Sequence, residues 1–206
     1  MKIIDLLHEK FIYQRRIKIL ACHLAKLIPQ NASVLDVGCG DGLLDRTIMT
    51  LRTDITICGI DVLIRGNSHI AIREFDGKNI PFDSSRFDVV MFIDVLHHTK
   101  NPEDLLKEAV RVSRGILVLK DHLKHGIFAG TILKLMDDIG NYRHGINLVY
   151  NYFTKKEWDK TFASLGLSVT DWDTMVRLYP WPLSLVFGRI LHFIARLNLP
   201  QKYYLQ

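Results

Sequence analysis

The chain has 206 residues, a length that predicts one domain with a single sizeable core. Its composition is that of an ordinary globular protein, with 48% hydrophobic and 24% charged residues. The net charge of +5 comes from basic residues that are scattered along the chain. A nucleic-acid-binding protein usually gathers such residues into a stripe or patch, so we expect no nucleic-acid partner.

The cysteines and the N-terminal residues indicate the cellular compartment in which the protein is expected. Cys22, Cys39 and Cys58 are odd in number and lack Cys-x-x-Cys spacing, which argues against a disulfide framework or a zinc ribbon. The first residues carry charges too early for a signal peptide. No apolar run approaches the ~18 residues of a transmembrane segment. We therefore expect a cytoplasmic protein.

Apolar residues recur with two periods, which predict strands that alternate with helices. Helices are expected over 11–28, 43–51, 102–112, 127–139 and from a Thr154/Glu157 capping box to Gly166. Strands are expected at 33–37, 55–60, 70–75, 87–93, 116–119, 167–172 and 190–197. Strands that alternate with helices imply right-handed βαβ units and a parallel sheet, so the fold class is α/β.

The most informative stretch follows the first expected strand. Gly38, Gly40 and Gly42 stand at every second position between that strand and a helix. Residues without Cβ adopt positive φ and let a ligand approach the backbone. Position 43 is Leu, so the Gly-x-Gly-x-x-Gly dinucleotide fingerprint is not matched. No Gly-Lys-Ser/Thr follows either, which excludes a P-loop.

Four segments, taken together, resemble the motifs of class I S-adenosylmethionine-dependent methyltransferases, in order and at the usual spacing. They are Asp36-x-Gly38-x-Gly40-x-Gly42, Gly59-Ile60-Asp61, Phe75-Asp76-Gly77, and Phe87-Asp88-Val89-Val90 with Asp94-Val95-Leu96-His97-His98. The chain is most similar to the broad bacterial type 11 methyltransferase-domain group over residues 10–120.

The resemblance implies a Rossmann-like fold, with a seven-stranded mostly parallel sheet, helices on both faces and an antiparallel edge. It also implies S-adenosylmethionine as cofactor and S-adenosylhomocysteine as product. We expect one methyltransferase domain over 1–206, in which residues 122–153 form a lid insertion on the acceptor side.

The cofactor offers a ribose diol, an adenine and an amino-acid head. Asp61 is expected to accept from the ribose hydroxyls, or alternatively to cap a helix. Asp76 resembles the residue that accepts from the adenine amine, although Asp-Gly is also a turn dipeptide. Arg16 could bind the methionine carboxylate or lie on a solvated helix face, and Asp36 would order the loop and support the ammonium. The expected cofactor residues are Arg16, Asp36, Gly38, Cys39, Gly40, Asp61, Val62, Asp76, Gly77 and Asp94.

Methyl transfer needs alignment of donor and acceptor, and a base only where the acceptor arrives protonated. Ligands of open α/β sheets lie beyond the carboxyl ends of the strands. This places His97 and His98 after the fourth strand and Asp121, His122 and His125 after the fifth. The catalytic candidates are His97, His98, Asp121 and His122, which could instead only structure their loops. A divalent metal could in principle be held by Asp94, Asp121, His122, His125, Asp137 and Asp138. No tight ligand motif is present, however, so we predict no metal.

The acceptor side is less defined. The irregular segment 140–152 carries Tyr142, His144, Tyr150 and Tyr152, which are expected to close over the acceptor or else to pack into the core. The bulky run 178–187 is either a packed connection or an apolar patch for a membrane or a partner.

We expect a small-molecule acceptor with an oxygen or nitrogen nucleophile. The alternatives are a lipid-like acceptor at the membrane surface and a non-catalytic protein that binds S-adenosylmethionine.

Overall fold

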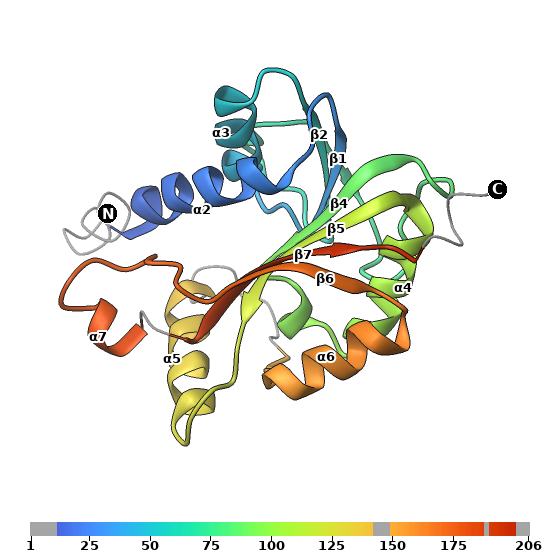
Figure 1. Cartoon of the computed structure of the whole chain (residues 1–206). Coiled ribbons are helices and arrows are strands. Elements are labelled where there is room, and N and C mark those ends of the chain that lie inside the picture. The colour runs from blue at the N-terminus through green and yellow to red at the C-terminus, as the bar shows by residue number, and fades with distance from the viewer. Residues whose placement is uncertain (1–11, 142–148, 188–189, 201–206) are drawn as a thin grey trace.

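The computed structural model, which describes residues 12–141, 149–187 and 190–200, has a seven-stranded sheet at its centre (Figure 1). The strand order is β3-β2-β1-β4-β5-β7-β6. Among the described strands only β7 is antiparallel to its neighbours, β5 and β6. The predicted sheet with an antiparallel edge is thus confirmed. The strands are β1 (Ser33–Val37), β2 (Thr56–Asp61), β3 (Ile72–Glu74), β4 (Phe87–Ile93), β5 (Ser113–His122), β6 (Ser168–Asp173) and β7 (His192–Asn198).

Helices cover both faces of the sheet. Figure 1 shows α2 and α3 on one side of it and α4 and α6 on the other. The capping box predicted at Thr154 is present and begins α6. The helices are α2 (Gln14–Leu27), α3 (Leu43–Leu51), α4 (Pro102–Val112), α5 (Ala129–Asn141), α6 (Lys155–Ser164) and α7 (Ser184–Phe187), with a 3-10 turn, η2 (Leu96–His98), after β4.

Strand β4 lies in the middle of the sheet, and its side chains pack into the cores on both faces. Val89 and Met91 belong to the core that α2 and α3 cover, whereas Val90 and Phe92 belong to the core under α4 and α6. A strand buried on both faces reads as a continuous apolar run instead of an alternation. The run 87–93 was therefore a direct sequence signal for a central strand.

Strand β5 is longer than predicted. Its last residues, Lys120, Asp121 and His122, are buried and pair with β7. Polar residues at the end of an apolar run normally indicate a loop, so the hydrophobic pattern ended at Leu119. These side chains belong to the strand because the fold buries them among other charged groups, which sequence periodicity does not reveal.

The bulky run 178–187 divides into two parts. Leu178 is fully buried and Tyr179 is half-buried, as expected for a packed connection. By contrast Trp181, Leu185 and Val186 are 79%, 73% and 53% exposed, so the packed interpretation is wrong for the second part of the run. The short helix α7 in this part contacts α5. No helix in the described ranges is both long and apolar enough to cross a membrane.

A pair of buried carboxyl groups lies beneath the glycine turn that follows β1. Asp36 lies in β1, just before the turn, and Asp45 lies in the first turn of α3. Both side chains are almost fully buried. The two carboxyl groups interact electrostatically, and among the described residues Asp36 Oδ1 and both Asp45 oxygens have no hydrogen-bond partner. Burial raises the pKa of both groups, that of Asp45 to about 7.

This pair predicts a pH-dependent stability. Because the folded-state pKa of Asp45 exceeds its ordinary value of 3.8, the pair's contribution is fully present at low pH and is lost as the pH rises through about 7. We expect Asp45→Asn to raise the free energy of unfolding at pH 8 by about 1–3 kcal/mol relative to the wild type, and by less at pH 5. Urea unfolding at both pH values measures this. An equal difference at both values, or the same result for Asp159→Asn on exposed α6, would contradict it.

Candidate functional site

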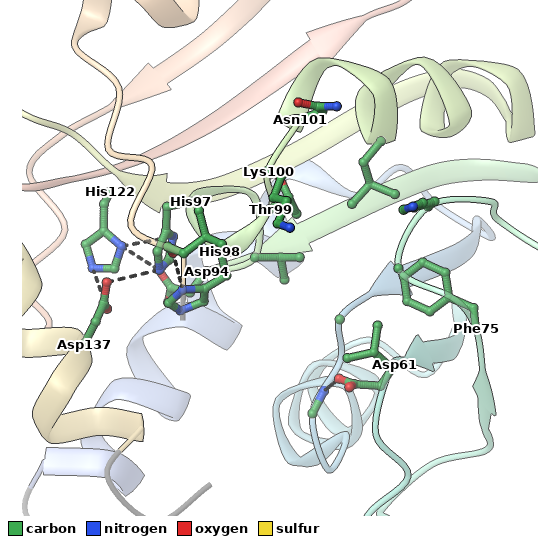
Figure 2. Close-up of a pocket in the computed structure, with 18 of the residues that line it drawn as sticks. Asp61, Phe75, Asp94, His97, His98, Thr99, Lys100, Asn101, His122 and Asp137 are labelled. Carbon is green, nitrogen blue, oxygen red and sulfur yellow. Dashed lines mark hydrogen bonds and ion pairs between the residues drawn. The ribbon is translucent and has the colours of Figure 1, made fainter. Parts of the chain in front are cut away.

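One large cavity, of about 910 Å³, opens at the carboxyl ends of the parallel strands. Its walls include Gly38 after β1, Asp61 at the end of β2, Asp94 after β4 and His122 at the end of β5. Cavities of roughly 300–1,000 Å³ are typical of small-molecule sites. Figure 2 shows Asp61 and Phe75 on one side of it, and Asp94, His97, His98, His122 and Asp137 together on the other. We call these two sides the turn end and the polar end.

The turn end is built mainly from backbone. Gly38 and Gly40 both have positive φ, +79° and +65°. A Cβ on Gly38 would lie 2.5 Å from Val95 Cγ2, so core packing requires that glycine. A Cβ on Gly40 would meet nothing closer than 3.4 Å, and this residue instead leaves room in the cavity wall.

Asp61 holds the turn end together. Its carboxylate accepts from the backbone N–H of Gly40 at 2.8 Å and from that of Leu63 at 3.0 Å. These two bonds fix the carboxylate at the edge of the cavity and fasten the glycine turn to β2. Each carboxylate oxygen keeps a further lone pair, so Asp61 can also accept hydrogen bonds from a diol in the cavity.

The Asp76-Gly77 pair, further along the turn end, has the turn role that the sequence offered, while its adenine role stays a prediction. Asp76 accepts from the backbone N–H groups of Lys78 and Asn79 and from the Asn79 side chain, which is the turn geometry. These hydrogen bonds from Asn79 and Lys78 lower the pKa of the exposed Asp76 carboxyl. Both Asp76 and Gly77 nonetheless line the cavity beside Phe75.

Most of the residues predicted to bind the cofactor line this cavity, and two do not. Asp36 lies beneath the turn and pairs with Asp45, so the expected contact with a methionine ammonium does not follow from its position. Cys39 is half-buried and packs close to Gly59. The predicted residues in the wall are Arg16, Gly38, Gly40, Asp61, Val62, Asp76, Gly77 and Asp94.

Asp94 joins three elements at the polar end. It accepts hydrogen bonds from Arg16 of α2 and from Lys120 of β5, whose side chain is fully buried. Burial opposes ionisation of Asp94, but the two cations outweigh it and hold the pKa of the carboxyl below its ordinary range. Arg16 is thus part of the cavity wall and does not lie on a solvated helix face.

His97 lies between two carboxylates. Its Nδ1 is 2.5 Å from Asp121 Oδ1, and its Nε2 is 3.4 Å from Asp137 Oδ2. Asp121 also accepts from the backbone N–H groups of Leu96 and His122 and does not line the cavity. Burial lowers the pKa of His97, but Asp121 and then Asp137 override it and raise it to about 10. Asp121 therefore orients His97 and does not itself face a ligand.

The other two histidines of the polar end are neutral. Burial, followed by the charge of His97, lowers the pKa of His98 and lowers that of His122 further. Both line the cavity, and His98 is only half-buried. A neutral imidazole offers a lone pair that can accept a proton or bind a cation. His125, by contrast, is exposed and lies outside the cavity wall.

The tyrosines expected over the acceptor are only partly described. Tyr142 and His144 lie outside the described residues. Tyr150 and Tyr152 donate hydrogen bonds to Asp138 and Asp137 of α5, and neither lines the cavity. The two hydroxyls therefore tie their segment to α5.

Several wall residues had no clear sequence signal. Tyr179 stands in the bulky run, and Met136 and Asp137 lie on α5, which reads as an ordinary helix. Lys120 and His192 lie behind the wall, fully buried on adjacent strands. The sequence signal for Lys120 and His192 was an ionisable residue inside an apolar strand, since such residues are rarely buried without partners.

The fold and the site define a class. An open sheet in this order, a glycine turn after β1 and a carboxylate at the end of β2 are the arrangement of class I S-adenosylmethionine-dependent methyltransferases. Consistent with this, the profile of the methyltransferase-domain family matches residues 11–171. The chain belongs to this family of methyltransferase domains.

Three similar proteins illustrate the relationship. The 27-O-demethylrifamycin SV methyltransferase of Amycolatopsis mediterranei is 30% identical over 122 residues, which are 50% of this chain and 44% of that protein. The sterol 4-C-methyltransferase of Caenorhabditis elegans is 31% identical over 127 residues, 54% of this chain and 38% of that protein. A SAM-dependent methyltransferase from Aquifex aeolicus has the same fold, with a TM-score of 0.62, 15% identity and coverage of 90% of this chain and 93% of that one. The chain thus spans less than half the length of these two sequence relatives.

Asp61 provides the test of the cofactor site. We expect S-adenosylmethionine to bind, and Asp61→Ala to weaken binding by ~1.5–3 kcal/mol because charged hydrogen bonds are lost. Calorimetry with S-adenosylhomocysteine and S-adenosylmethionine measures the change. The control is Asp159→Ala, which removes an exposed carboxylate on α6 and should leave affinity unchanged. Unchanged affinity in a folded Asp61→Ala variant would remove Asp61 from the site.

Proposed function

We propose that this protein transfers a methyl group from S-adenosylmethionine to an oxygen or nitrogen atom of a small-molecule acceptor. The observation that carries the proposal is one continuous cavity, which joins the turn end to the polar end. The turn end suits the cofactor, because Gly40 leaves space and Asp61 presents a fixed carboxylate. The name of the Amycolatopsis relative also describes methylation at an oxygen of a small molecule.

The residues divide the work between binding and orientation. Bound S-adenosylmethionine supplies an electrophilic methyl group on a sulfonium. Asp61 would accept from the ribose hydroxyls, and Arg16, which pairs with Asp94 in the cavity wall, would bind the methionine carboxylate. The polar end holds the acceptor so that its nucleophilic atom points at the turn end, since alignment supplies most of the catalysis in such a displacement. His98 and His122 are the neutral groups there that can bind or deprotonate a hydroxyl or an amine, whereas His97, with its raised pKa, would donate a hydrogen bond.

Residues 122–153 form the acceptor-side cover in this proposal. Met136 and Asp137 on α5, and Val149 beyond it, belong to the cavity wall. A segment of this kind that closes over the acceptor would exclude water before transfer. The closing motion, with Tyr142 and His144 included, stays a prediction.

Methyl transfer itself is tested with a panel of small hydroxyl and amine compounds. We expect S-adenosylhomocysteine to form only with certain panel members, and Asp61→Ala to lower its rate of formation through weaker cofactor binding. Mass spectrometry identifies the methylated product. Binding of S-adenosylmethionine without transfer to any compound would favour the alternative of a non-catalytic binding protein.

A lipid-like acceptor at a membrane surface is a second candidate. The exposed Trp181, Leu185 and Val186 follow directly after Tyr179, which lines the polar end. Ile127 and Phe128, which precede α5, are also exposed. Large apolar side chains exposed on a surface often belong to interaction sites. The Caenorhabditis relative is named for methylation of a sterol.

A soluble acceptor and a membrane-bound acceptor predict different binding of the protein to lipid vesicles. For a membrane-bound acceptor we expect the protein to sediment with phosphatidylcholine vesicles, and the double variant Trp181→Ser/Leu185→Ser to lose most of that binding because its apolar area is removed. Leu51→Ser, at a 52% exposed leucine on α3, is the matched control. Equal sedimentation of both variants, or none for the wild type, would leave only the soluble acceptor.

A further inference from the structure

Three side chains at the polar end have possible metal-ligand atoms close to one another. His97 and His98 come from η2, and Asp137 comes from α5. One ring nitrogen of each histidine and one carboxylate oxygen of Asp137 lie within 4.8 Å of one another, and all three residues line the cavity. We propose that they form a binding site for a divalent transition-metal ion such as Zn²⁺, a site that the sequence did not predict.

The separation of His97 from Asp137 fits two ligands of one metal ion better than a good hydrogen bond. His97 Nε2 is 3.4 Å from Asp137 Oδ2, whereas good N–H···O bonds have lengths of about 2.7–3.2 Å. Two ligands at roughly 2.0–2.1 Å from one tetrahedral Zn²⁺ lie about 3.4 Å apart. In the described part of the chain His97 Nε2 has no hydrogen-bond partner, although the His97 side chain is only 1% exposed. A buried nitrogen of this kind needs a partner, and a metal ion would supply one.

Each proposed ligand also has the supporting contact that metal ligands usually have. His97 Nδ1 is hydrogen-bonded to Asp121, which leaves the lone pair of Nε2 for a metal. His98 Nδ1 lies 3.3 Å from the carbonyl oxygen of Val149, which leaves its Nε2 as the ligand atom. The Tyr152 hydroxyl donates to Asp137. Carboxylates, backbone carbonyls and hydroxyls that orient ligands in this way are typical of metal sites.

The charges around the site favour a cation. The polar end contains three carboxylates, those of Asp94, Asp121 and Asp137, but Arg16 and Lys120 both pair with Asp94. The carboxylates of Asp121 and Asp137 lie at the two ring nitrogens of His97. A cation bound at Nε2 of a neutral His97 would therefore lie beside the Asp137 carboxylate, which attracts it.

The ligand set indicates an open site. Two histidines and a carboxylate leave a coordination position free in catalytic zinc sites, and imidazole ligands favour transition metals over Mg²⁺. Here that position faces the cavity, because all three ligands are in its wall. A hydroxyl group of the acceptor that takes this position would lose its proton to water more readily. That role rests on the proposed methyl transfer, whereas metal binding itself does not.

Metal binding is tested on the full chain without S-adenosylmethionine, after treatment with EDTA and buffer exchange. We expect calorimetry with Zn²⁺ to show one saturable site, and His98→Ala and Asp137→Asn each to weaken it at least tenfold. The matched control is Asp138→Asn, which changes the neighbouring carboxylate of α5 that accepts from Tyr150 instead. Circular dichroism verifies that each variant is folded. Because His98 is only half-buried, we expect His98→Ala to disturb folding less than Asp137→Asn.

Substitution with Co²⁺ gives a second readout. We expect d–d absorption bands of four- or five-coordinate Co²⁺ in the wild type and in Asp138→Asn, and their loss in His98→Ala. Absence of saturable binding, or equal Zn²⁺ affinity in His98→Ala and the wild type, would overturn the proposal and leave His97 as a protonated bridge between two carboxylates. Because these measurements need no methyl transfer, their failure leaves the proposed reaction standing, and a lack of transfer leaves the metal site standing.

Discussion

The cavity depends on the mutual neutralisation of charges that the fold buries beneath it. Lys120 is fully buried near the carboxyl end of β5, and Asp94 is the carboxylate that compensates it. Removal of one partner of such a pair costs about 3–5 kcal/mol, because a buried charge is left alone. The same carboxylate holds Arg16, so the pairing also fixes α2 against the sheet. His97 and His98 follow Asp94 on one short turn, and their positions are set by this anchor.

The parts of the fold that could be predicted are those with a local cause. The ends of β4 and α4 agree with the sequence prediction, because β4 is buried on both faces and Pro102 starts its helix. The end of β5 could not be predicted, since Lys120 and His122 are strand residues only through their pairing with β7. That pairing joins segments far apart in the chain, and no local pattern records it.

The residues of the site also divide into those with a local sequence signal and those without one. Asp61 could be found because its distance from the glycine turn is set by one βαβ unit, and the structure joins the two through the Gly40 N–H bond. Asp137 could be named only as one of several possible metal ligands, because α5 has the amphipathic pattern of any surface helix and only tertiary packing brings it to His97. The burial of Asp36 was hidden for a related reason. Its motif position indicated the loop, while its burial near Asp45 depends on tertiary packing.

The two ends of the cavity therefore differ in how easily they can change. The turn end consists of glycines and backbone N–H groups whose geometry is needed for core packing, as the clash of a Gly38 Cβ with Val95 demonstrates. Few substitutions there leave the fold intact. The polar end is assembled from side chains of α2, η2, β5 and α5, so a substitution there changes a side chain and not a backbone turn, provided that the ion pairs of Asp94 stay balanced. A fold of this construction keeps one cofactor site while its acceptor chemistry varies, so the acceptor has to be inferred from the charges at the polar end and not from the fold.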